Sequence, residues 1–106
     1  MPSPDAFPCR NEVPWRTLDT EALVIDAKKG LLYPLNSVGA RIWQLSDGSH
    51  SVNDIVRTLV GEFDIDEATA RSDALTFLDN LASAGLVSID VAPRLRPADA
   101  KHGRSS

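Results

Sequence analysis

The sequence predicts a small α+β domain in which short strands near the N-terminus precede three helices. Between residues 15 and 35, short apolar runs alternate with turn residues, as expected for a β-meander. Between residues 36 and 85, three apolar runs with helical spacing each follow a capping residue, which is Asn36, Ser51 or Asp66. A chain of 106 residues has room for one such domain with one modest core.

Three segments, residues 15–18, 22–26 and 31–35, are predicted as strands. Gly30 suits the positive φ of the bend between the last two. The third segment contains Pro34, which has no N–H for a ladder, so this strand is predicted to lie at a sheet edge. The proline then has two interpretations. It discourages indiscriminate edge pairing, or it ends the strand before the first helix.

The helix boundaries follow from capping residues. The first helix is predicted to end at Gly48. Ser51 and Asp54 form a shortened capping box at the start of the second helix. The third helix is predicted to run to residue 84 and to stop at Gly85, before a strand-like segment over residues 86–91.

The third helix has an apolar arc of about half its circumference, wider than a surface helix usually needs. Arg71 lies inside this arc. One interpretation is that part of the arc packs on the core while the rest lines a groove with Arg71 as its cation. The other is that the extra residues thicken the core and Arg71 extends to solvent. The arc comprises Ala68, Ala70, Ala74, Leu75, Phe77, Leu78, Leu81 and Ala82.

The two ends of the chain differ from its middle. Residues 1–14 have three prolines in the first eight positions and no apolar signal-peptide run, so a flexible N-terminal arm is expected. Residues 15–91, the predicted domain, carry six Lys or Arg against twelve Asp or Glu. Residues 92–106 are basic and poor in apolar residues, so a disordered tail is expected. The tail is either a solubilising extension or a source of avidity for an acidic partner.

Catalytic and metal-binding patterns are not found in the sequence. Cys9 is the single cysteine and is expected to be an exposed, unreactive thiol in the arm. His50 and His102 lie far apart and suggest neither a catalytic dyad nor a metal site. We therefore expect no enzyme activity, no metal and no cofactor. No apolar stretch is long enough to span a bilayer, and we expect a cytoplasmic protein without a membrane partner.

A strand with a free edge beside a helix with spare apolar surface suggests β-augmentation. In this mode an extended peptide adds itself to the edge, and alternate side chains enter pockets.

The order of these features resembles the PqqD-like family, which comprises small peptide chaperones also called RiPP recognition elements. The resemblance covers about residues 15–90 and rests on order and spacing rather than on one motif. The matching positions are Tyr33, Leu35, Asn36, Gly39, Ala40, Ile42, Trp43, Asp47, Gly48, Ile55, Leu59, Phe63, Asp73, Phe77, Leu78, Leu81, Gly85 and Leu86.

The resemblance implies a winged helix-turn-helix-like domain of three short N-terminal strands followed by three helices, without catalytic residues. Members bind the leader of a ribosomally made precursor peptide as a strand between the third strand and the third helix. They then present the peptide to a modifying enzyme, often a radical S-adenosylmethionine protein and sometimes a protease or cyclase. By this resemblance the third helix contributes Arg71, which meets a leader carboxylate, together with Ala74, Leu75 and Leu78. The strand side is Gly30, Leu31, Leu32, Tyr33, Pro34 and Leu35.

Two other functions compete with this one. A winged helix commonly reads DNA, but the third helix and its cap carry four acidic residues against Arg71 alone, and phosphate contacts need cations. The sequence thus disfavours nucleic acid as a partner. The alternative is a scaffold module in which the free edge pairs with a second copy, so that a monomer and a homodimer both remain open. Whether the pathway makes pyrroloquinoline quinone or another peptide product is not specified by the sequence.

Overall fold

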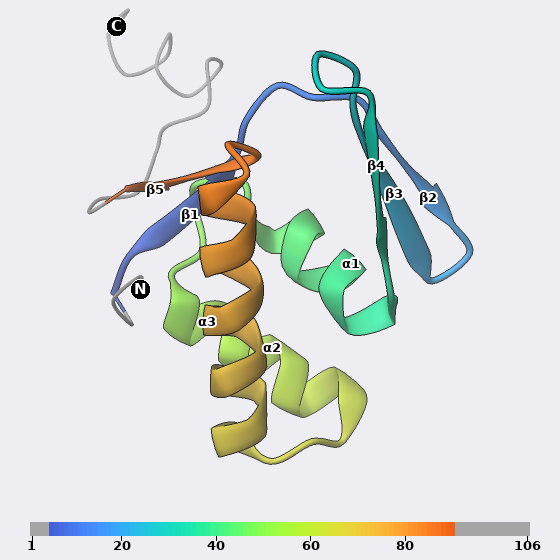
Figure 1. Cartoon of the computed structure of the whole chain (residues 1–106). Helices are drawn as coiled ribbons and strands as arrows, with labels where there is room; N and C mark the ends of the chain where they lie inside the picture. Colours follow the sequence, from blue (N-terminus) through green and yellow to red (C-terminus); the bar gives the residue numbers. More distant parts are fainter. Residues whose placement is uncertain (1–4, 91–106) are drawn as a thin grey trace, which may run out of the picture.

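The structure, a computed structural model, describes residues 5–90 and contains five strands and three helices. The strands form a three-stranded sheet and a two-stranded sheet. In Figure 1 the larger sheet lies beside the helices, and the smaller one lies at one end of the helix over residues 67–83. The α+β class is confirmed, and so is the order of three predicted strands followed by three helices. A strand over residues 7–10 was not expected, and a strand over residues 87–90 follows the helices within the strand-like segment expected at residues 86–91. The elements are β1 (Phe7–Arg10), β2 (Trp15–Leu18), β3 (Glu21–Asp26), β4 (Leu31–Leu35), α1 (Ser37–Leu45), α2 (Val52–Phe63), α3 (Glu67–Ser83) and β5 (Val87–Asp90).

The larger sheet is antiparallel with the order β2-β3-β4. Its register pairs Val24 of β3 with Tyr33 of β4 and Leu23 with Pro34. Gly30 has φ +66° in the turn between these strands, the conformation for which glycine is suited. Because β4 is hydrogen-bonded to β3 alone within the described residues, the predicted edge position of this strand is confirmed.

The smaller sheet corrects the expectation of an N-terminal arm. Residues 7–10 form β1, which pairs antiparallel with β5. Arg10 holds β1 in place, because its Nη1 donates to the carbonyl oxygens of Trp43 and Gln44 at 2.9 and 2.8 Å, and its guanidinium lies 5.3 Å from the centroid of the Trp15 ring. Cys9, expected to be exposed, is 8% exposed and buried in β1. Residues 1–4 and the predicted basic tail lie outside the described residues.

The helix starts are those that the capping residues predict. Asn36 accepts from the N–H of Gly39 at 2.8 Å. Ser51 and Asp54 form a complete capping box, in which the Ser51 N–H donates to the Asp54 carboxylate and lowers the pKa of that carboxyl. Asp66 caps α3. The helix ends agree less well, because α1 stops at Leu45, three residues before Gly48.

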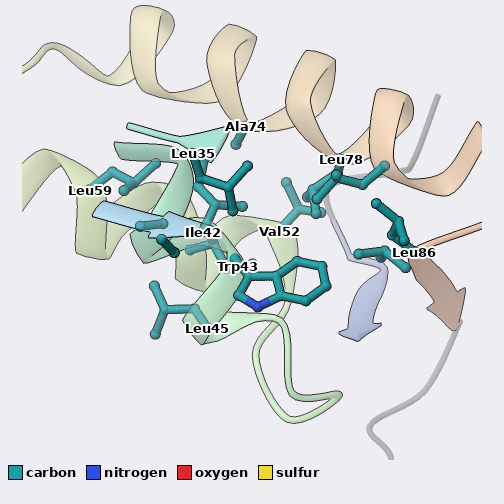
Figure 2. Close-up of a cluster of buried hydrophobic side chains, with 14 of the residues drawn as sticks. Leu35, Ile42, Trp43, Leu45, Val52, Leu59, Ala74, Leu78 and Leu86 are labelled. Atoms are coloured by element: carbon teal, nitrogen blue, oxygen red, sulfur yellow. The ribbon is translucent and has the colours of Figure 1, made fainter. Parts of the chain in front are cut away.

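The core lies between the helices and the inner face of the larger sheet. Figure 2 shows side chains from different elements converging there: Leu35 from β4, Ile42 and Trp43 from α1, and Leu78 from α3. The Trp15 ring meets that of Trp43 edge to face, with centroids 6.1 Å apart. This packing fixes α1 between the sheet and α3. No helix within residues 5–90 has both the length and the apolarity needed to cross a membrane.

Candidate functional site

The free edge of β4 is formed by the backbone groups of Leu32 and Pro34. The N–H of Ile25 donates to Pro14 on the β2 side, at 2.8 Å. Since backbone groups alternate along a strand, Val24 of β3 faces β4 and bonds with its partner Tyr33. Leu32 and Pro34 then point away from β3. The missing N–H of Pro34 is therefore at the free edge, where it costs the native sheet no hydrogen bond.

The side chains of β4 divide between two faces of the sheet. Leu35 is buried and Tyr33 is half-buried against the core, so these two define the helix-facing side. Leu32 and Pro34 are exposed on the opposite face, and Leu32 is 62% exposed. Leu31 shares the helix-facing side but remains 46% exposed near the turn. A strand added to this edge would have its side chains sorted in the same way.

A hollow of about 410 Å³ lies between α1 and α3, beside Asn36, the residue directly after β4. Its apolar part comes mainly from α1 and from one aromatic ring of α3, while α3 also supplies polar groups. In Figure 1, β4 is the strand of its sheet on the side of α3. The free edge and the hollow thus lie on the same side of the molecule. The lining residues are Asn36, Val38, Gly39, Ile42, Asp73, Thr76, Phe77 and Asn80.

Local structure explains this hollow. Asn36 turns its side chain toward the start of α1 to cap it, so the chain bends sharply after β4. Gly39 has no side chain at the point where α1 approaches Phe77, and a Cβ atom there would lie 3.0 Å from Cε1 of the ring. Phe77 therefore sits directly against the α1 backbone and forms one side of the hollow.

One contact joins the turn before β4 to the C-terminal end of α3. Lys29, in the turn after β3, donates from Nζ to the carbonyl oxygen of Ala84 at 3.2 Å. The carboxylate of Asp26 accepts the backbone N–H of Lys29 at 3.3 Å and steadies this turn. The Lys29 contact and the hollow therefore lie at opposite ends of β4.

The structure separates the predicted α3 residues. Ala74 and Leu78 are completely buried in the core and not available to a ligand in this conformation. Arg71 and Leu75 instead border a different hollow of about 380 Å³, shared with Ala68, Ser72 and Thr76. The two hollows have only Thr76 in common. The four predicted residues are thus not gathered beside β4.

Arg71, predicted as the cation of a groove, also has partners within the protein. Its Nη2 lies 2.8 Å from a carboxylate oxygen of Glu67, and its Nη1 donates to the Asn53 side chain at 2.9 Å. These contacts tie α3 to the start of α2. A leader carboxylate would have to share Arg71 with both of them.

Sequence analysis missed the α3 residues that do border the hollow beside β4. Asp73, Thr76, Phe77 and Asn80 follow the i, i+3, i+4, i+7 spacing of a single helix face. Three of the four are polar and lie outside the apolar arc of this helix, whereas Phe77 belongs to the arc but was expected in the core. The signal for these positions is a mixed polar and apolar helix face next to the buried one.

A cluster of Asp47, Ser49 and His50 contains the residue types of a hydrolase triad without its geometry. His50 Nδ1 lies 3.0 Å from the Asp47 carboxylate and 3.3 Å from Ser49 Oγ. A triad needs the serine and the carboxylate on different ring nitrogens. Burial alone would raise the pKa of Asp47, but hydrogen bonds from Ser49 and His50 bring it below the usual value. The cluster stabilises the turn before α2. No group of three potential metal ligands is present among residues 5–90.

Comparisons with known proteins agree with this architecture. Residues 21–87 match the family model described as coenzyme PQQ synthesis protein D (PqqD). A solved structure described as TbiB1 in complex with the TbiA(beta) leader peptide is similar, with 27% identity, a TM-score of 0.68, and coverage of 76% of this chain and 94% of that chain. A second, described as lasso peptide synthetase B1 complexed with the leader peptide, has 26% identity, a TM-score of 0.65, and coverage of 79% and 98%.

No curated protein matches the chain significantly. The family model nevertheless covers more than half of the sequence, from the start of β3 to the start of β5. It therefore includes the free edge of β4 and all of α1 and α3. The family resemblance of the sequence is confirmed: this chain belongs to the PqqD family.

Proposed function

We propose that this chain binds the leader of a ribosomally made precursor peptide by β-strand addition to β4. The observation that carries the proposal is the free edge of β4 on the same side as the α1–α3 hollow. Both similar solved structures are described as complexes with a leader peptide. The role is non-catalytic: the domain holds the peptide and a separate enzyme modifies it.

The binding energy has two sources. The edge supplies main-chain hydrogen bonds, and the hollow takes alternate side chains of the added strand. Exposed Leu31 and Leu32 provide apolar surface beside that strand. Such an interface, after the entropy of ordering the peptide, is compatible with about −8 kcal/mol, which corresponds to micromolar affinity.

The hollow also indicates which α3 residues meet the peptide. We propose that Asp73, Thr76, Phe77 and Asn80 lie beside the leader, because they border the hollow that begins at Asn36, the residue directly after β4. The predicted contact of Arg71 and Leu75 with the leader remains a separate proposal at the neighbouring hollow. A leader long enough to pass both hollows would cross α3 near Thr76.

The modifying enzyme is the second partner in this proposal. A domain without catalytic residues is useful only if the bound peptide reaches an enzyme, such as a radical S-adenosylmethionine protein, a protease or a cyclase. Such a complex would work in the cytoplasm, where precursor peptides are made. DNA binding is disfavoured, because α3 presents Glu67, Asp73 and Asp79 along its length and its one cation, Arg71, is paired with Glu67.

Calorimetric titration tests the proposal. The purified chain is titrated with a synthetic leader from the short precursor encoded nearest to its gene, with a random DNA duplex in parallel. We expect saturable peptide binding in the calorimeter. In NMR spectra of the same mixture, the amide chemical shifts of residues 31–35 other than Pro34, and of residues 73–80, should change. No detectable peptide binding, together with salt-sensitive binding of the duplex, would establish the DNA-binding alternative instead.

A further inference from the structure

The free edge of β4 is chemically asymmetric. Leu32 presents both its N–H and its carbonyl to an incoming strand, whereas Pro34 presents a carbonyl only. This follows from the alternation set by Ile25, whose N–H donates toward β2, and from the pairing of Pro34 with Leu23. Within β4, the edge accepts two hydrogen bonds and donates one.

We propose that Pro34 determines the register in which a peptide pairs with β4, an inference that rests on the proposed function. Within β4, only Leu32 can both donate and accept a main-chain hydrogen bond with the peptide. Opposite Pro34, the peptide can donate an N–H to the Pro34 carbonyl. The peptide carbonyl that would accept from residue 34 has no donor, because proline has no N–H. This holds for a parallel or an antiparallel peptide, because in either orientation the absent donor is the Pro34 nitrogen.

The peptide that fits this edge has a definite pattern. It offers two N–H groups on residues two positions apart, one for Leu32 and one for Pro34. The residue between them points its backbone groups away from β4 in an antiparallel arrangement. Its side chain lies on the same sheet face as Tyr33, the face toward the helices and the hollow. The two donating residues project to the opposite face, next to exposed Leu32 and Pro34.

The sheet face that carries Leu32 and Pro34 indicates which side chains the two donating peptide residues should have. Leu32 is 62% exposed and Leu18 is 50% exposed, while Leu23 and Ile25 are half-buried beside them. Cross-strand pairing places Leu18, Leu23, Ile25, Leu32 and Pro34 on one side of the sheet. Arg16 and Glu21 share this side but lie on β2 and at the start of β3, away from the free edge. Apolar side chains on the two donating peptide residues would extend this surface. A proline at either donating position would be excluded, since each needs an N–H.

Two measurements test the proposal. The first compares Pro34→Ala with Pro14→Ala, which makes the same chemical change at an exposed residue outside β4. Pro34→Ala adds the missing donor, so the leader peptide should bind about three- to tenfold more tightly. Pro14→Ala should leave its affinity unchanged. A Pro34→Ala affinity equal to or weaker than that of wild type would overturn the proposal.

The second measurement uses wild-type protein and leader peptides in which single amides are replaced by esters, which removes one N–H without adding bulk. We expect affinity to fall about three- to tenfold at two positions separated by one tolerant residue. A run of consecutive sensitive positions, or none, would overturn the register. If the unmodified peptide does not bind, the proposed function itself fails. If it binds but the pattern is absent, only the role of Pro34 fails.

Discussion

Phe77 of α3 packs so closely on Gly39 of α1 that a Cβ atom on Gly39 would lie 3.0 Å from Cε1 of the ring. This contact sets the spacing of the two helices beside the end of β4. It also places the ring at the side of the hollow. A single glycine therefore links core packing to the shape of the candidate site.

Gly39→Ala is expected to alter binding more than stability. Alanine favours a helix by about 1 kcal/mol over glycine, and this gain offsets the cost of moving the Phe77 ring. The free energy of unfolding should thus change by less than about 1 kcal/mol, while the ring shifts into the hollow and weakens peptide binding. The matched control is Gly61→Ala, because a Cβ on Gly61 meets no atom within 4 Å. Equal stabilisation by both changes would show that the Phe77 contact is loose.

Leu78→Ala is expected to destabilise the domain by about 2–5 kcal/mol in urea denaturation. Leu78 is fully buried, so its truncation leaves a cavity in the core. Leu75→Ala on the same helix should cost less, because Leu75 is half-buried. A small loss for Leu78→Ala, with impaired peptide binding, would return Leu78 to the ligand surface that the sequence predicted.

Arg71→Ala is expected to leave the chain folded. An exposed ion pair such as Arg71–Glu67 contributes about 0–1 kcal/mol, and the bond to Asn53 adds a similar amount. Leader titration of this variant then decides whether the Arg71 hollow takes part in binding. If Arg71 contacts a leader carboxylate, the variant should bind the leader more weakly than wild type at low salt. This difference in affinity should disappear at high salt, which screens the ion pair. Unchanged affinity would confine the peptide to the β4 side of α3.

Cys9 provides a test of β1. As the single cysteine of the chain it reports one site, and its burial in β1 predicts slow reaction with a thiol reagent under native conditions. Urea should accelerate the reaction by exposing the thiol. A native rate equal to the rate in urea would support the flexible arm that the N-terminal prolines suggested. Arg10→Ala should accelerate the native reaction, since it removes the bonds to the end of α1.

The sequence alone determined the features that depend on neighbouring residues, which are the starts of the helices and the edge position of β4. The caps at Asn36, Ser51 and Asp66 place the starts of three helices, because each satisfies a backbone N–H within three residues of itself. The edge position of β4 followed from Pro34, which has no donor for a ladder. The family pattern also depends on such local spacings, which is why the sequence was sufficient to identify it.

Only the tertiary structure determined the features that depend on residues distant in the sequence, which are the β1–β5 pairing and the face that α3 turns toward the core. The pairing of β1 with β5 joins segments at opposite ends of the domain. Arg10 stabilises β1 through a hydrogen bond to the end of α1, which is more than 30 residues away in the sequence, so no local sequence pattern indicates it. The rotation of α3 about its axis was decided in the same way. Packing against α1 and α2 buries Ala74 and Leu78 and turns Asp73 and Phe77 toward the hollow. Helical periodicity defines which residues share a face, but only packing determines what that face meets.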